Sequence, residues 1–275
     1  MKRINKKIIF IGGLTNGYKT LEFLVKTKYI KISLAITSSI SNVPRFKNLK
    51  QNFKELKVIE TKNLRNYYKK IKKIKPDLII VSGWSSLIDK QILEIPKKGV
   101  VGFHPSNLPK DRGRSTLAWQ IEEGYKNTAL TMFYYNTKPD SGNIIAKKKI
   151  VIKKTDYIEN ILDKVDIATE QLLKKYFKKL FFKNLKSYPQ NEKKATYRTL
   201  RTKKNQIINW DEDKTKIFNK IRALSKPYPG AIAVIKGKVY KIWRAKINYS
   251  KKPKKNTFIK KCKNGYLEIE DYEPC

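Results

Sequence analysis

The sequence contains few of the residues that bind metals or form disulfides. Among its 275 residues there are one histidine, His104, and two cysteines, Cys262 and Cys275. Structural zinc sites need clustered cysteine and histidine ligands, and a disulfide framework needs several cysteines. The composition therefore excludes both classes, predicts no bound metal, and favours a reducing, cytoplasmic location.

Acidic residues and long apolar runs are also scarce. Lysine and arginine total 63 against 23 aspartates and glutamates, so the formal net charge is +40. This charge attracts nucleic acid, anionic membrane surfaces and phosphorylated small molecules alike. Because the basic residues are spread along the whole chain, we interpret most of them as solvated surface, with a nucleic-acid footprint as the alternative. No apolar run reaches the roughly 20 residues that span a bilayer, so we expect no membrane insertion.

What the sequence does contain is an alternation of short apolar runs with amphipathic segments. The apolar runs are KIIFIGG, ISLAITS, DLIIVSG, GVVGFHP and ALTMFYYN. Strands buried on both faces are continuous apolar runs, and helices between them imply parallel crossovers. The pattern predicts an α/β fold with a Rossmann-like, mostly parallel sheet flanked by helices. Ligands of such sheets bind at the carboxyl ends of the strands, where His104 and the segment Asn136 to Asp140 are expected.

The chain divides into three regions by composition. Residues 1–185 hold the alternating pattern and end in a long amphipathic helix that begins near Asp156, and we predict that they form the catalytic domain. Residues 186–204 are polar and predict a linker. Residues 205–275 show one helix followed by short strands with glycine turns, which predicts a small β-rich, OB-like domain. Gly12 and Gly13 match no phosphate-loop pattern, so we expect a tight strand-to-helix turn there.

A loop rich in proline, glycine and basic residues follows His104. Pro105 ends the strand, and Lys110, Arg112 and Arg114 lie close together in the sequence, as in a loop that binds an anion. A lone histidine in an apolar context is usually structural, so its position alone does not decide its role.

Asp140 lies in a Pro-Asp-Ser-Gly turn between two predicted strands. Two interpretations remain open from the residues alone. Asp140 forms an ordinary Asx turn, or its carboxylate reaches His104, raises the pKa of the imidazole and determines which ring nitrogen carries the proton.

Two separated motifs resemble one known family. HPSNLPKDRGRSTLAW, with an Asp-Ser-Gly that begins 36 residues after the histidine, resembles the HxSLLPxxRGxxP loop and DxGxI turn of the formyltransferases that use 10-formyltetrahydrofolate. INWDEDKTKIFNKIRALSKPYPGA resembles the C-terminal segment of the same enzymes. Two motifs in the right order are far more specific than one short match, and the similarity extends from the first strand to about Ala245.

The resemblance implies a site, a cofactor and a chemistry. His104 and Asp140 would be the catalytic pair, and 10-formyltetrahydrofolate would donate the formyl group without a covalent enzyme intermediate. The family normally has asparagine two residues before the histidine, where this chain has Gly102. A donor aimed at a developing oxyanion is worth about 2.7–4 kcal/mol, so another group, with Asn107 or a water as candidates, would replace it, or this member is slower or differently specialised. The implied folate-binding residues are Ser86, Leu87, Ile88, Arg114, Asn136, Thr137, Lys138, Pro139 and Asp140.

The acceptor of the formyl group is the open question. One candidate is a nucleotide-linked amino sugar, with Lys110, Arg112 and Arg201 as anion partners. The other is the amino group of an initiator methionyl-tRNA, which the +40 charge would suit. We favour the sugar, because the tRNA enzymes carry a longer C-terminal barrel and a longer insertion than SSISNVPRFKNLKQ. A third reading is a nucleic-acid binder on a degenerate scaffold, and a homodimer is left open.

Overall fold

The computed structural model describes residues 6–39, 45–182, 185–235, 237–248, 253 and 257–275. Residues 40–44 of the short insertion segment lie outside the described residues. The chain forms two compact units. The first contains Met1–Arg112, Ala129–Lys149 and Val165–Tyr197, and the second contains Gly113–Thr128, Ile150–Lys164 and Arg198–Cys275. Each unit therefore combines segments that are distant in the sequence.

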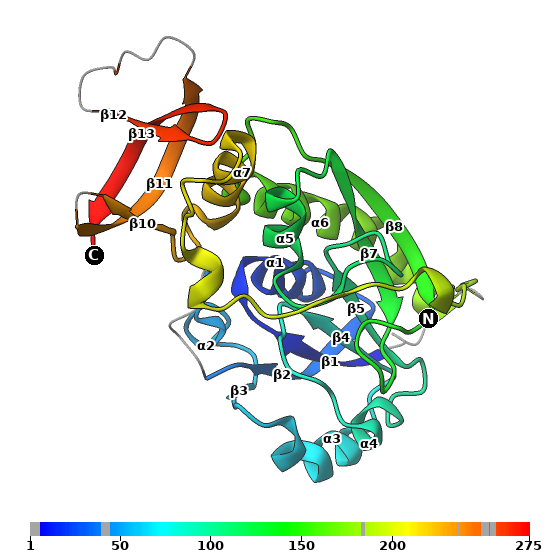
Figure 1. The fold of residues 1–275 in the computed structure, drawn as a ribbon. Coiled ribbons are helices and arrows are strands. Elements are labelled where there is room, and N and C mark those ends of the chain that lie inside the picture. The colour runs from blue at the N-terminus through cyan, green and yellow to red at the C-terminus, as the bar shows by residue number, and fades with distance from the viewer. Residues whose placement is uncertain (1–5, 40–44, 183–184, 236, 249–252, 254–256) are drawn as a thin grey trace. The chain divides into compact units, whose positions relative to one another are not determined.

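The helices and strands follow one another as the apolar runs predict (Figure 1). In chain order they are β1 (Lys6–Gly12), α1 (Leu14–Val25), β2 (Ile30–Thr37), α2 (Leu49–Asn52), β3 (Val58–Glu60), η1 (Leu64–Tyr67), α3 (Tyr68–Ile74), β4 (Leu78–Ser82), α4 (Lys90–Leu93), β5 (Val100–His104), β6 (Arg112–Gly113), α5 (Thr116–Glu122), β7 (Asn127–Tyr134), β8 (Ile144–Val151), α6 (Ile158–Phe182), η2 (Glu192–Lys194), β9 (Tyr197–Arg198), η3 (Lys203–Gln206), α7 (Lys214–Leu224), β10 (Ala231–Ile235), β11 (Lys238–Asn248), β12 (Phe258–Cys262) and β13 (Gly265–Pro274).

The first unit is built on a seven-stranded sheet of order β3-β2-β1-β4-β5-β7-β8. The pairings from β3 to β5 are parallel, and β7 runs antiparallel to β5. Four consecutive residues of β1, Ile8 to Ile11, are completely buried, as both-faced burial of a parallel strand requires. The predicted α/β class with a mostly parallel sheet is confirmed.

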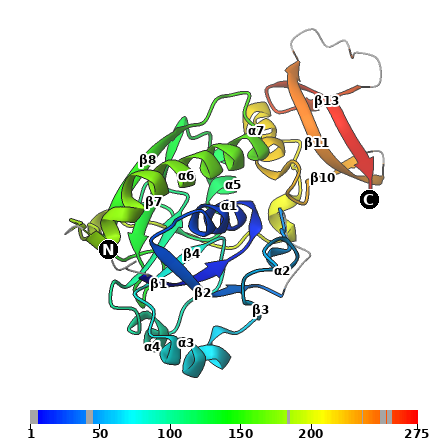
Figure 2. The same ribbon diagram turned by 180° about the vertical axis from the view of Figure 1, so that it is seen from behind.

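Helices cover both faces of this sheet, which makes three layers. On one face, a core cluster joins strand residues such as Ile9 and Ile79 to Ile71 of α3 and Ile92 of α4. On the other face α1 and α6 lie together (Figure 2), and the rings of Phe23 and Phe177 meet edge to face at 5.6 Å. Burial of both faces stabilises the sheet through the apolar area removed from water.

The turn from β1 to α1 is tight, as expected from its glycines. Gly13 N donates to the Ser82 carbonyl at 3.1 Å, so β1 and β4 remain in contact beyond the end of the strand. A Cβ built on Gly12 would lie 1.8 Å from the Ser82 carbonyl oxygen, which no side chain tolerates. The glycine is therefore required for this close approach of the two backbones.

The second unit has its own core. A four-stranded antiparallel sheet, β10-β11-β13-β12, packs against α7 through Ile217, Ile221, Ile242 and Leu267, all of which are fully buried. Arg222 of α7 donates to the carbonyls of Lys153 and Asp156 at 3.1 and 2.6 Å. The predicted helix followed by short strands is confirmed as a β-rich C-terminal domain.

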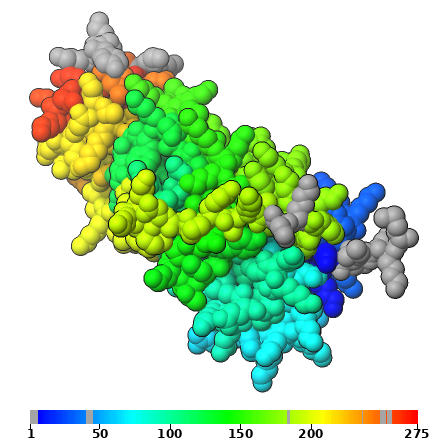
Figure 3. All heavy atoms as spheres, turned by 90° about the vertical axis from the view of Figure 1, so that its right-hand side faces the viewer, coloured from blue at the N-terminus to red at the C-terminus, as the bar shows by residue number. Residues whose placement is uncertain are grey.

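Residues 186–204 are mostly exposed (Figure 3), yet their backbone is ordered by specific contacts. Within the first unit Arg112 N donates to Thr196 O at 2.9 Å, and within the second Arg114 N donates to Arg198 O at 3.1 Å. The segment predicted as a linker therefore adds a short strand, β9, along the loop that follows His104.

In the described residues, no helix combines the length and the apolar character that crossing a membrane requires.

The Gly12 turn makes the first testable prediction. Gly12→Ala should lower the free energy of unfolding by about 3 kcal/mol, the upper end of the cost of overpacking, because its Cβ meets backbone. Gly13→Ala is the matched control, since its Cβ would lie 3.2 Å from the Thr37 side chain, and should cost about 1 kcal/mol or less. Urea denaturation measures both; equal losses would contradict the prediction.

Candidate active site

His104 ends strand β5 with its imidazole buried, its residue exposure being 6%. Its Nε2 lies 2.7 Å from the backbone carbonyl oxygen of Asp111 in the following loop. Because a carbonyl oxygen can only accept a hydrogen bond, Nε2 carries the proton. In the neutral imidazole the other ring nitrogen, Nδ1, is then the hydrogen-bond acceptor.

The Asp140 carboxylate faces that second nitrogen. Its Oδ2 lies 3.5 Å from Nδ1 of His104, and the two side chains are 17% and 7% exposed. The interpretation in which the carboxylate reaches the histidine is thus the one that the structure supports. The geometry pairs a buried imidazole with a slightly more exposed carboxylate, an arrangement suited to proton transfer.

The route by which Asp140 reaches His104 differs from the expected meeting of parallel strand ends. The register pairs Val101 with Tyr134 and His104 with Thr131, so the residues after Tyr134 leave the sheet beside the amino end of β5. The turn then returns along the sheet, with Asp140 in the left-handed region at φ 50°.

A hydrogen-bond network centred on the buried Arg112 side chain holds the Asp140 turn in place. Gln190 Nε2 donates to the carbonyls of Asp140 and Gly142, at 2.8 Å each. The Gln190 amide oxygen accepts from Arg112 Nε and Nη2, at 3.1 and 2.8 Å. Arg112 also forms a two-point ion pair with Glu192, at 2.9 and 2.7 Å. Since Arg112 directly follows Asp111, the same residue pair supports both His104 and Asp140.

The structure corrects the predicted role of Arg112. Its side chain is fully buried, and Gln190, Glu192 and the Tyr197 hydroxyl accept from it, so it is not free to bind a substrate anion. The hydrogen bond to Glu192 is the main cause that raises the pKa of Arg112 above its usual value. Lys110, by contrast, is exposed.

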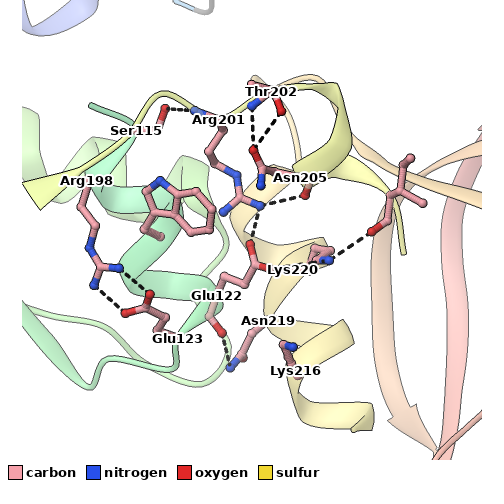
Figure 4. Close-up of polar contacts among 12 residues, drawn as sticks. Ser115, Glu122, Glu123, Arg198, Arg201, Thr202, Asn205, Lys216, Asn219 and Lys220 are labelled. Atoms are coloured by element: carbon pink, nitrogen blue, oxygen red, sulfur yellow. Dashed lines mark hydrogen bonds and ion pairs between the residues drawn. The ribbon is translucent and has the colours of Figure 1, made fainter. Parts of the chain in front are cut away.

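Arg201, a second predicted anion partner, is held by residues of its own unit, while its Nε and Nη1 have no hydrogen-bond partner among the described residues. Its guanidinium is stacked over Trp119 with 4.2 Å from Cζ to the ring centroid, is ion-paired to Glu122 and donates to the Asn205 carbonyl at 2.9 Å (Figure 4). Its side chain is 7% exposed. A hollow of about 500 Å³ lies beside Trp119, Glu122 and Glu123. Both glutamates are already ion-paired, Glu122 with Arg201 and Glu123 with Arg198.

The predicted folate-binding segments of the first unit lie in loops at strand ends. Ser86 to Ile88 lie between β4 and α4; Leu87 is 70% exposed, whereas Ile88 is buried. Asn136, Thr137, Lys138 and Pro139 are exposed, and the Asn136 amide oxygen accepts from Lys138 N and the Ser141 hydroxyl. An exposed leucine beside loop backbone fits a flat ligand with a polar edge. Arg114 is exposed and belongs to the second unit.

Asn107 was one of two candidates to replace the missing asparagine. Its side chain makes a different contact. It is exposed, and its amide oxygen accepts from Lys147 Nζ at 2.7 Å. The space beside Gly102 is instead filled by Tyr135: a Cβ at residue 102 would lie 2.3 Å from the tyrosine ring. Sequence reasoning missed Tyr135 and Gln190. No local sequence pattern signals the tyrosine, because it reaches Gly102 only through the antiparallel pairing of β5 with β7.

Among the described residues, no three histidine, cysteine or acidic side chains gather as metal ligands would. The fold and site together define an α/β domain with a histidine–carboxylate pair beyond one of its parallel strands, and a small antiparallel β domain follows in the chain. Residues 6–176 match the formyl transferase family, and residues 201–274 match the formyl transferase C-terminal domain. The chain belongs to the formyl transferase family.

Individual relatives agree with this assignment. The chain is 32% identical over 209 residues to the methionyl-tRNA formyltransferase of Bacillus velezensis, covering 76% of this chain and 66% of that protein. It is 30% identical to the bifunctional polymyxin resistance protein ArnA of Wigglesworthia glossinidia brevipalpis, covering 96% of this chain and 42% of that protein. The chain thus spans two thirds or less of the length of these two relatives.

A solved structure matches along the whole chain. It is the N-formyltransferase of Helicobacter canadensis in complex with folinic acid and dTDP-3-aminofucose, with a TM-score of 0.77 and 20% identity, covering 98% of this chain and all of that one. At this identity the match shows that the two chains share a fold.

The network around Gln190 makes the second prediction. Gln190→Ala should lower the free energy of unfolding by about 1–3 kcal/mol, because it removes hydrogen-bond partners from Arg112 and from two backbone carbonyls. Lys193→Ala is the control, since Lys193 is an exposed residue of the same segment, and should change stability by less than about 0.5 kcal/mol. Thermal denaturation of both variants checks the difference, and equal stabilities would refute the supporting role of Gln190.

Proposed function

We propose that this protein transfers a formyl group from 10-formyltetrahydrofolate to the amine of a nucleotide-linked amino sugar. The observation that carries the proposal is the His104–Asp140 pair, 3.5 Å apart, in a chain of the formyl transferase family. The reaction forms a bond from the amine nitrogen to the formyl carbon and breaks the bond from that carbon to the folate nitrogen. One proton moves from the attacking amine to the departing folate nitrogen.

In this mechanism His104 and Asp140 handle the proton. The Asp111 carbonyl holds Nε2 in its protonated state, so Nδ1 and the Asp140 carboxylate share the proton that leaves the amine. The imidazolium that forms when His104 takes up this proton lies beside the Asp140 carboxylate, and its charge stabilises the negative charge that develops on the formyl oxygen. When bound, the folate supplies the formyl group and accepts the proton.

Binding of the folate is assigned, within the first unit, to Ser86, Leu87 and Ile88 and to Asn136, Thr137, Lys138, Pro139 and Asp140. Arg114 of the second unit stays a prediction from the family resemblance. The exposed Leu87 side chain would cover one face of the pterin, while loop backbone groups pair with its edge. Of the three predicted anion partners, Lys110 remains a candidate for the diphosphate, because it is exposed and stands in the loop after His104.

The choice of a sugar acceptor is supported by the full-length match to a solved N-formyltransferase whose complex contains dTDP-3-aminofucose. The product would be a formylated nucleotide sugar of the kind used in polysaccharide biosynthesis.

A second acceptor is favoured by different observations. The Bacillus velezensis relative is a methionyl-tRNA formyltransferase, and the net charge of +40 suits a polyanionic partner. The deciding experiment supplies 10-formyltetrahydrofolate with UDP- or dTDP-linked 4-amino and 3-amino sugars in one series, and with charged initiator tRNA in another. Formylation of a sugar is the expected result, and formylation of tRNA alone would replace the sugar by the second acceptor.

The catalytic pair makes the third prediction. Asp140→Asn should keep the fold, because asparagine tolerates the positive φ of this residue, and should lower kcat at least about 100-fold. His104→Ala should lower it as much or more. Lys148→Ala, at an exposed residue of β8, should leave kcat unchanged. Steady-state kinetics measure the three variants; wild-type turnover in Asp140→Asn would remove Asp140 from the mechanism.

If the chain were a nucleic-acid binder on a degenerate scaffold, His104→Ala would leave its binding intact and its affinity for nucleic acid would fall steeply with salt. Nucleic-acid binding by His104→Ala, measured over a range of salt concentrations, therefore separates this third reading from the enzymatic ones.

A further inference from the structure

The ring of Tyr135 lies against the backbone of the strand that carries His104. Tyr135 follows the last residue of β7, and its backbone N donates to the Val100 carbonyl at 2.8 Å. A Cβ built on Gly102 would lie 2.3 Å from Cε2 and 3.2 Å from Cζ of this ring. Cζ is the ring carbon that carries the hydroxyl. The hydroxyl is therefore bonded to an atom that lies next to the Cβ position of residue 102.

The Tyr135 ring lies on the same face of β5 as the His104 side chain. Side chains alternate along a strand, so residues 102 and 104 point to the same side of the sheet. An asparagine at residue 102 would project its amide into the space beside the imidazole. In this chain the tyrosine enters the same space from the neighbouring strand, and its polar end is a hydroxyl.

Packing holds the ring in this place. Tyr135 stacks on Phe133 with a centroid separation of 5.0 Å and an interplanar angle of 17°. It also packs against the core cluster that includes Val81 and Ile88. A side chain fixed in this way presents its hydroxyl at a defined position, which is what preorganised stabilisation of a transition state requires.

The phenol remains protonated in this environment. Burial raises the pKa of Tyr135 far above its usual value, and the nearby Asp140 carboxylate raises it further. A neutral phenol is a hydrogen-bond donor, whereas a phenolate would only accept.

We propose that the Tyr135 hydroxyl donates a hydrogen bond to the formyl oxygen as it becomes an oxyanion, and so takes the place of the asparagine that Gly102 lacks. The proposal rests on the proposed formyl transfer. As the amine adds to the formyl carbon, the carbonyl π electrons move to the oxygen, which Tyr135 stabilises. The electrons return when the bond to the folate nitrogen breaks, and Tyr135 keeps its own proton throughout.

The fourth prediction removes the hydroxyl and leaves the ring. Tyr135→Phe should lower kcat about 100- to 1,000-fold, the usual effect of losing one oxyanion donor, with KM changed less than about threefold. The affinity for folinic acid, measured by calorimetry, and the melting temperature should match the wild type. Tyr134→Phe is the matched control, a partly buried tyrosine in the adjacent position of the same segment, and should keep wild-type kinetics.

A rescue experiment tests whether Tyr135 acts as a hydrogen-bond donor or only fills the space beside Gly102. Gly102→Asn alone should destabilise the protein, since its Cβ collides with the ring. Tyr135→Ala opens that space and should be nearly inactive, and the double variant Gly102→Asn, Tyr135→Ala should regain at least about tenfold in kcat over Tyr135→Ala by supplying an amide donor.

Two results would overturn the proposal, and they are distinguishable. An active wild-type enzyme with an equally active Tyr135→Phe variant would show that the ring only fills space, and the proposed function would stand. A wild-type protein that formylates neither sugars nor tRNA would remove the proposed function and this inference together.

Discussion

The buried guanidinium of Arg112 is the group on which the geometry of the site depends. A charge removed from water is costly unless it is paired and its donors are satisfied. Here one carboxylate, one amide oxygen and one phenol accept its hydrogen bonds. The backbone before Arg112 binds His104, and the amide that binds Arg112 also holds the turn of Asp140. One satisfied cation therefore sets the distance between two residues that are far apart in the sequence.

The partners of this cation come from a segment that has little regular structure. Gln190, Glu192 and Tyr197 all lie in the polar region after α6, and they contact Arg112 across sequence separations of 78 to 85 residues. Such loops lack a core of their own, and they are ordered by what they bind. The active-site loop and the segment after α6 thus stabilise each other, and neither is a free connection between domains.

Much of the fold could be predicted from the sequence, because a strand that is buried on both faces is a continuous run of apolar residues. The apolar runs of β1, β4 and β5 marked the central strands, and the helical period of 158–182 marked α6. The short strand β3 has only partly buried and exposed residues, so it forms no apolar run that would predict it. Arg112 was misassigned because a basic residue in a loop with proline and glycine has the composition of a surface residue. Its burial depends on partners that no local pattern reveals.

By itself, the sequence determined the order of the elements, the both-faced burial of the sheet and, through its two motifs, the family. The tertiary structure decided which basic side chains are buried in ion pairs, that the turn after β7 brings Asp140 back to His104, and that the Tyr135 ring fills the space beside Gly102. The physical reason is range. Periodicity and burial are properties of neighbouring residues, whereas ion pairs, strand register and complementary sizes join residues only after the chain has folded.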